Sequence, residues 1–215
     1  MPTRTSWRST RASPRSRPAA DRDLTRGPGS GRVVLGPPSD RSAVIVRIPL
    51  PAGLERLRRA SIGNAADGVP AHATLLHPFV EPERLRPDVR RLVGSVAAEH
   101  EAFDFSLSGP ARWPDVVYVS LEPVEPFVRL QAELARAFPA FRIYGRDGDF
   151  EFVPHASVAE GKAVDDPDTV GDPAWAALPR PGRASAIEVI ARGPKGRWRT
   201  VWRIGLGRRS RSGAR

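Results

Sequence analysis

Apolar and polar residues alternate along several short segments of this chain, and this pattern predicts a protein rich in β-strands. A strand places successive side chains on opposite faces, so alternation with a period of two indicates a strand with one buried face. Short apolar runs between turn residues indicate strands as well. The segments with either pattern are residues 42–50, 72–80, 103–107, 116–121, 150–159, 186–191 and 198–206.

Other segments repeat apolar residues every three or four positions, which is the period of an α-helix. In the first of them Leu54, Leu57 and Ile62 form the apolar stripe, and Arg58 is expected to face solvent. Strand–strand steps mix with strand–helix–strand steps, so we expect an α+β fold with largely antiparallel sheets. The predicted helices are residues 53–62, 87–100 and 126–138, with one short helix near 173–178.

Composition divides the chain into a central domain and two basic tails. Residues 1–41 are rich in Arg, Ser, Pro and Gly and hold few apolar residues. Such a segment buries too little surface to offset its chain entropy, so we expect it to be disordered, as we do residues 208–215. The domain is therefore predicted over residues 42–207. The acid-poor start also resembles an organellar transit peptide without clear amphipathic periodicity, and a misassigned start codon would explain it equally well.

The net charge of +10 belongs to the ends of the chain. Residues 1–42 hold nine Arg and three Asp, and residues 192–215 hold nine basic residues and no acid. Residues 43–191 hold the other 16 basic residues and 21 acidic ones, a net charge of −5. Basic ends can contact RNA weakly and without sequence preference, but the coding bias of a GC-rich genome is the simpler source of so much arginine.

The absence of cysteine and of long apolar segments limits the classes of protein that fit this sequence. The chain has no cysteine, which excludes disulfides, thiolate nucleophiles and cysteine-based zinc sites. It has no run of about 18 apolar residues that would suggest a membrane span, and no apolar segment of a secretory signal. We therefore expect a soluble, cytoplasmic monomer without membrane contact.

Two segments repeat one arrangement of a histidine and a hydroxyl, each after an apolar residue and a proline. The pairs are His72 with Thr74 and His155 with Ser157. On a strand this spacing puts both side chains on one face, with Cα atoms about 6–7 Å apart. Two such pairs facing one another would hold a ligand at four points. His77 is an odd number of positions from His72, so we expect it on the opposite face, in a structural role and not as part of a metal pair.

These two motifs, with the later Gly196-Arg197-Trp198, give the sequence its resemblance to a known family. The chain resembles the two-histidine (2H) phosphoesterase superfamily, in particular the bacterial 2'-5' RNA ligases, also called RNA 2',3'-cyclic phosphodiesterases. The resemblance covers about residues 43–207. It implies a duplicated α+β fold of two lobes, with antiparallel sheets and helices around a central cleft.

The resemblance also implies a chemistry for the two motifs. His72 would donate a proton and His155 would accept one, while Thr74 and Ser157 hold the phosphate; histidine can do either near neutral pH. No metal or other cofactor is required. The implied substrate is a cyclic nucleotide or the 2',3'-cyclic phosphate end of an RNA, with reversible 2'-5' RNA ligation as a related activity.

Some residues leave the substrate and the activity open. Glu160 follows the second motif where RNA-processing relatives often have a basic residue, and an acid there would disfavour a polyanion. Trp113 and Tyr144 lie beside predicted loops and are the better candidates for stacking on a base. A different class of function also fits the pattern: a non-catalytic module that binds phosphate or RNA with the same cleft and the basic tails.

Overall fold

The computed structural model describes residues 35–141, 143–145 and 151–207. Its strands are β1 (Pro38–Ser39), β2 (Ser42–Arg47), β3 (His72–Leu76), β4 (Phe79–Val80), β5 (Phe103–Trp113), β6 (Val116–Glu122), β7 (His155–Glu160), β8 (Arg180–Ala184), β9 (Ala186–Arg192) and β10 (Trp198–Gly205). Its α-helices are α1 (Ala52–Ser61), α2 (Gly63–Ala66), α3 (Pro87–Glu99), α4 (Glu125–Ala137) and α5 (Pro167–Val170). Short 3₁₀ helices are η1 (Pro82–Arg84), η2 (Ile143–Gly145), η3 (Gly161–Val164) and η4 (Pro173–Ala177).

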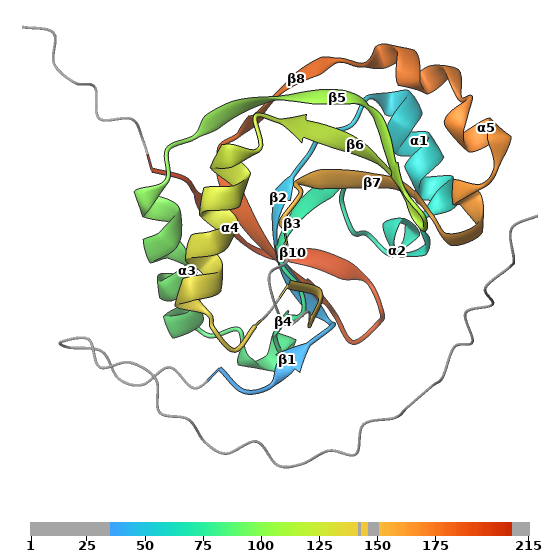
Figure 1. Cartoon of the computed structure of the whole chain (residues 1–215). Coiled ribbons are helices and arrows are strands. Elements are labelled where there is room, and N and C mark those ends of the chain that lie inside the picture. Colours follow the sequence, from blue (N-terminus) through green and yellow to red (C-terminus); the bar gives the residue numbers. More distant parts are fainter. Residues whose placement is uncertain (1–34, 142, 146–150, 208–215) are drawn as a thin grey trace, which may run out of the picture. The chain divides into compact units, whose positions relative to one another are not determined.

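Two four-stranded sheets form the framework of the described residues (Figure 1). One has the strand order β3-β2-β9-β10 and the other β7-β6-β5-β8, while β1 pairs separately with β4. All of these pairings are antiparallel. The two histidine motifs lie on β3 and β7, each of which is the edge strand of its sheet, and these two edge strands contact one another.

Each sheet contains the same strand–helix–strand unit, which is the duplication that the resemblance implied. In one unit α1 joins β2 to β3, and in the other α4 joins β6 to β7. The helices cross over, because α1 packs against β7 and α4 packs against β3. Figure 1 shows α3 beside α4. The predicted antiparallel α+β fold is therefore confirmed.

One hydrophobic core extends under both sheets and explains why the motif side chains face outward. In β3 the side chains of Ala73 and Leu75 are buried in this core, while His72 and Thr74 are only partly buried. The same alternation holds in β7, which buries the two residues that flank Ser157. The period of two thus points each histidine and its hydroxyl away from the core.

Several elements differ from the sequence prediction. Strand β2 ends at Arg47 where 42–50 was predicted, β5 continues to Trp113 beyond the predicted 103–107, and β1, α2 and α5 were not predicted. The predicted strand over 72–80 is divided into β3 and β4, and β8 was not predicted because its segment lacks alternating apolar residues and buries fully only Ala184. Strand β8 lies at a sheet edge, where exposed side chains and Pro181 are tolerated.

The predicted tails fall largely outside the described part of the chain. Residues 1–34 and 208–215 are not described. The second motif strand was predicted over 150–159, but the described residues 151–154 are not strand and β7 begins at His155. Residues 35–41 are described, and β1 among them pairs with β4, so ordered structure starts before residue 42. In the described part, every helix is too short or too polar to cross a membrane.

Candidate functional site

The side chains of both motifs line a single cleft of about 420 Å³. His72 and Thr74 come from β3, and His155 and Ser157 come from β7. The structure therefore brings together the four residues that the sequence singled out. It does so because two edge strands from different sheets meet at this point.

Both motif histidines are held in the same orientation by their own backbone. The Nδ1 atom of His72 lies 2.7 Å from the carbonyl oxygen of Pro70, and that of His155 lies 2.9 Å from the carbonyl oxygen of Val153. A carbonyl oxygen only accepts, so each Nδ1 carries the hydrogen and donates it. The neutral imidazoles consequently keep Nε2 as a free acceptor, and this is the atom left for a ligand in the cleft.

Aromatic rings fix the position of His155 further. Its ring packs in an edge-to-face manner on Trp113, with centroids 4.6 Å apart, and on Tyr118 at 5.3 Å. Trp113 and Tyr118 also pack on each other at 4.3 Å. Trp113, one of the two candidates for stacking on a base, contacts the histidine, and Tyr144, the other candidate, lines the cleft with 43% of its surface exposed.

Burial shifts both imidazoles toward their neutral form. It lowers the pKa of His72 to about 4, and the positive charge of Arg58 acts in the same direction while the Pro70 carbonyl opposes it. Burial also lowers the pKa of His155 from 6.5, and its hydrogen bond to Val153 opposes the change. At neutral pH both imidazoles of the cleft are therefore uncharged, each with an acceptor nitrogen.

The lowered pKa of His72 predicts that the folded state loses stability in acid. An unfolded histidine takes up its proton near pH 6.5, but the folded one does so only near pH 4, so the unfolded state binds more protons between these values. After allowance for the partial exposure of His72, this costs about 2 kcal/mol between pH 7 and pH 4.5. Urea unfolding at pH 7 and pH 4.5 should show this loss of unfolding free energy in the wild type and a smaller loss in His72→Gln. Equal losses in the two proteins would contradict the lowered pKa of His72.

His77 also lines the cleft, so the prediction that it faces away from His72 is wrong. The cause is a register shift in β3: Thr74 pairs with Ile45 and Leu76 with Val44, which leaves Leu75 as an extra residue. A bulge of this kind reverses the faces of the residues that follow it. The Nδ1 atom of His77 lies 3.3 Å from the carbonyl oxygen of Ser42.

The second motif strand has the same irregularity at the equivalent position. Ser157 pairs with Tyr118 and Ala159 with Val117, so Val158 is the extra residue and Glu160 turns into the cleft. His77 and Glu160 are both five positions after the histidine of their motif. The cleft is therefore lined by three pairs of equivalent positions, one member of each pair coming from each motif. The first two pairs match in chemistry, as two histidines and two hydroxyls, whereas the third combines a histidine with an acidic residue.

Burial raises the pKa of Glu160 from its ordinary value of 4.5, while the hydroxyl of Ser157 and the charge of Arg58 oppose this. The carboxyl group thus interacts with a hydroxyl predicted to bind phosphate. Asp115 adds to the rise by repulsion.

Arg58 is the functional candidate that the sequence analysis missed. It lines the cleft but is only 2% exposed, contrary to the prediction that it faces solvent. Its Nη2 donates to the carbonyl oxygen of Val69 at 2.8 Å, and Nη1 lies 3.4 Å from Glu55 Oε1. The spacing of Leu54, Arg58 and Ile62 by four residues was the available signal, because it places all three on one buried stripe.

The loop before the first motif is held against the hairpin that contains Trp198, another residue of the cleft lining. The backbone nitrogen of Trp198 donates to the carbonyl oxygen of Asp67 at 2.8 Å. Gly68 has a φ of +103°, and a Cβ there would lie 2.9 Å from the carbonyl oxygen of Trp198. Only glycine fits this close approach without a shift of backbone.

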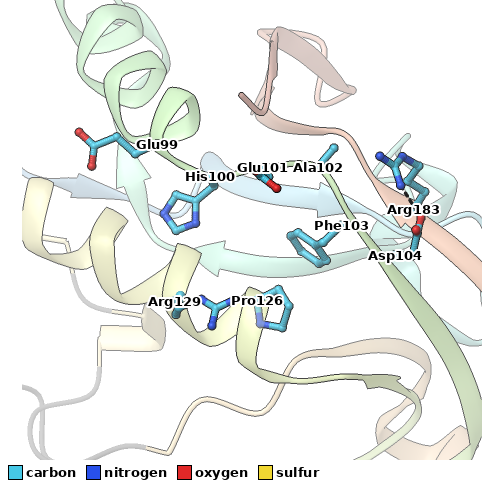
Figure 2. Close-up of a pocket in the computed structure, with 9 residues that line it drawn as sticks. All are labelled: Glu99, His100, Glu101, Ala102, Phe103, Asp104, Pro126, Arg129 and Arg183. Atoms are coloured by element: carbon cyan, nitrogen blue, oxygen red, sulfur yellow. Dashed lines mark hydrogen bonds and ion pairs between the residues drawn. The ribbon is translucent and has the colours of Figure 1, made fainter. Parts of the chain in front are cut away.

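A larger cavity of about 610 Å³ lies away from these residues (Figure 2). It is lined by Glu99, His100, Glu101, Ala102, Phe103, Asp104, Pro126, Arg129 and Arg183. Three of its polar side chains are paired: Arg183 Nη1 lies 2.6 Å from Asp104 Oδ1, and His100 Nε2 lies 2.7 Å from Glu133 Oε2. It contains no member of the two motifs. Nowhere in the described residues do three or more His, Asp or Glu side chains gather closely enough to hold a metal ion.

One known structure supports the fold, and a second is similar to a lesser degree. The crystal structure of TT0787 of Thermus thermophilus superposes with a TM-score of 0.52 at 22% identity, over 79% of this chain and 99% of that one. The crystal structure of E. coli LigT complexed with 3'-AMP gives a TM-score of 0.45 at 19% identity, over 79% of this chain and 99% of that one. No curated protein matches the sequence.

A family model matches most of the chain as well. The family model of the 2'-5' RNA ligase superfamily matches residues 46–195, which include both histidine motifs and the helices α1 and α4. Two equivalent strands with a histidine and a hydroxyl meet in one cleft within this range. The chain therefore belongs to the 2'-5' RNA ligase superfamily of two-histidine phosphoesterases.

Proposed function

We propose that this protein is a metal-independent cyclic phosphodiesterase that opens 2',3'-cyclic phosphates by acid–base catalysis. The observation that supports this most directly is the matched pair of imidazoles, His72 and His155, which line one cleft with Nδ1 bound to backbone and Nε2 left as an acceptor. Opening a cyclic phosphate needs one group to take a proton and one to give a proton, and two imidazoles supply both.

The reaction can be written atom by atom. One Nε2 removes a proton from a water molecule as its oxygen attacks phosphorus. The bond from phosphorus to one ribose oxygen breaks, and the protonated Nε2 of the other histidine gives its proton to that oxygen. Thr74 and Ser157 would donate hydrogen bonds to the non-bridging oxygens, where the negative charge of the transition state increases. In ligation, the 5' hydroxyl of a second RNA would take the place of the water molecule.

The electrostatics of the cleft favour His72 as the proton acceptor and His155 as the donor. Arg58 and burial both keep His72 neutral, so the proton that the reaction needs resides more readily on His155. This is the reverse of the assignment that the family resemblance implied. A bound phosphate would raise the pKa of both imidazoles because it is an anion, and would thereby allow one of them to be protonated.

The first test is turnover of nucleoside 2',3'-cyclic phosphates in excess EDTA, followed by phosphorus NMR. We expect loss of the cyclic phosphate resonance and the appearance of one phosphomonoester, whose identity shows which ring bond breaks. Activity that disappears in EDTA and returns with a divalent cation would contradict the two-histidine mechanism. Saturable binding without any product would instead support the non-catalytic phosphate-binding alternative.

A further inference from the structure

The proposed function requires the cleft to bind a phosphate, yet the described part of its lining has more acidic than basic residues. Among the described lining residues, Asp40 and Glu160 are acidic and Arg58 is basic. The Arg58 side chain is only 3% exposed and already contacts Val69 and Glu55. Grooves that bind RNA strands follow the backbone phosphates with several accessible Lys or Arg side chains. The described lining of this cleft lacks that feature.

Glu160 is the charged group best placed to act on a bound substrate. The bulge at Val158 turns it to the cleft face of β7, three positions after Ser157. The Ser157 hydroxyl interacts with its carboxylate, so the two side chains are close together. A phosphate held by Ser157 would therefore have a carboxylate beside it. The other charged groups that act on Glu160 are Arg58 from α1 and Asp115 from the turn between β5 and β6.

We propose that Glu160 is a specificity-determining residue that restricts the cleft to substrates with a single phosphate group, such as a nucleoside 2',3'-cyclic phosphate. This inference rests on the proposed function, since it concerns the substrate of the same site. In an RNA end, the next phosphate is attached to the 5' oxygen of the same ribose, so it enters the cleft together with the cyclic phosphate. Glu160 repels the phosphate held by Ser157 in both substrates, and its additional repulsion of the second phosphate weakens binding of the RNA end, relative to the mononucleotide, by about tenfold.

Binding of two stable nucleotides tests the proposal without any need for turnover. Adenosine 2'-monophosphate carries one phosphate, and adenosine 2',5'-bisphosphate adds the second at the position that an RNA chain would occupy. Titration calorimetry should show that the wild type prefers the monophosphate. In Glu160→Gln, which keeps the size of the side chain, the ratio of the two dissociation constants should shift toward the bisphosphate by about tenfold. The shift should shrink as salt is raised, because salt screens exposed charges.

Two further variants separate charge at this position from charge in general. Glu122→Gln removes one negative charge at the end of β6, outside the cleft lining, and should leave the ratio as in the wild type. Glu160→Asp keeps the charge and should retain most of the preference for the monophosphate. An unchanged ratio in Glu160→Gln, or failure of the wild type to bind either nucleotide, would overturn the proposal.

Turnover distinguishes this inference from the proposed function. The comparison is between kcat/KM for a nucleoside 2',3'-cyclic phosphate and that for a dinucleotide ending in the same cyclic phosphate. Glu160→Gln should raise kcat/KM for the dinucleotide more than kcat/KM for the mononucleotide, mainly by lowering KM for the dinucleotide. If Glu160→Gln hydrolyses the cyclic phosphates but changes neither the ratio of dissociation constants nor the ratio of kcat/KM values, the inference fails and the proposed function stands. If no cyclic phosphate is hydrolysed but the ratio of dissociation constants changes, the proposed function fails and the role of Glu160 in binding stands.

Discussion

Replacing either His72 or His155 by alanine is expected to lower kcat/KM for a 2',3'-cyclic phosphate by about 10²- to 10⁴-fold. Each imidazole would handle one proton of the reaction, and no other described imidazole occupies an equivalent motif position. The double variant should be little worse than either single one, because groups that act as a unit do not contribute additively. Steady-state rates measured by phosphorus NMR or by a coupled phosphatase assay provide the comparison.

A control variant shows whether a loss of activity could come from unfolding. His100 lies outside the cleft and bonds to Glu133, and His100→Gln keeps a polar side chain of similar length there. It should retain nearly full activity. Far-UV circular dichroism should be the same in all of these proteins. A histidine variant that folds normally and keeps more than about a tenth of the activity would contradict the catalytic pair.

The same variants can assign the two roles if the leaving group is changed. A 4-nitrophenyl phosphodiester releases a phenolate that needs no proton, so loss of the general acid matters little for such a substrate. On this substrate we expect His155→Ala to have an activity close to that of the wild type. His72→Ala should remain much slower than the wild type. Recovery in His72→Ala instead would support the direction that the family resemblance implies.

Truncation of Phe79 is expected to lower the free energy of unfolding by about 3–5 kcal/mol in Phe79→Ala. The ring is fully buried, and its centroid lies 5.1 Å from that of Phe138 and 5.3 Å from that of Phe141. These contacts join β4 to the segment that follows α4, so the cavity would open between the two strand–helix–strand units. A loss of this size is a large part of the roughly 5–15 kcal/mol that stabilises a typical domain.

Chemical denaturation measures this change directly. Val128→Ala, on an exposed position of α4, removes apolar atoms without opening a cavity and should change stability by less than about 0.5 kcal/mol. Phe79→Leu should fall between the two, because leucine refills part of the space. If Phe79→Ala cost less than about 1 kcal/mol, the three rings would not form one packed unit.

Local sequence patterns were sufficient for the elements whose burial alternates regularly. Helix α4 was predicted over 126–138 and extends over Glu125–Ala137, and β9 was predicted over 186–191 and extends over Ala186–Arg192. Each motif histidine lies on the same strand face as its hydroxyl, whereas the meeting of β3 and β7 brings the two pairs into one cleft. A spacing of two residues is enough to establish the shared face.

The remaining features depend on pairings that no local pattern contains. His77 and Glu160 reach the cleft through bulges, and an extra residue in a ladder is visible only once the partner strand is known. Strand β8 is exposed at an edge and has no apolar face to detect. Arg58 is different, since its helical spacing with Leu54 was present in the sequence but its charge suggested a solvated position.

The crossing of the two helices makes the two strand–helix–strand units depend on one another. A polypeptide with only one unit would leave its motif strand uncovered, because α1 packs against β7 and α4 packs against β3. Neither unit is therefore expected to fold alone, and the two should unfold together in one cooperative transition.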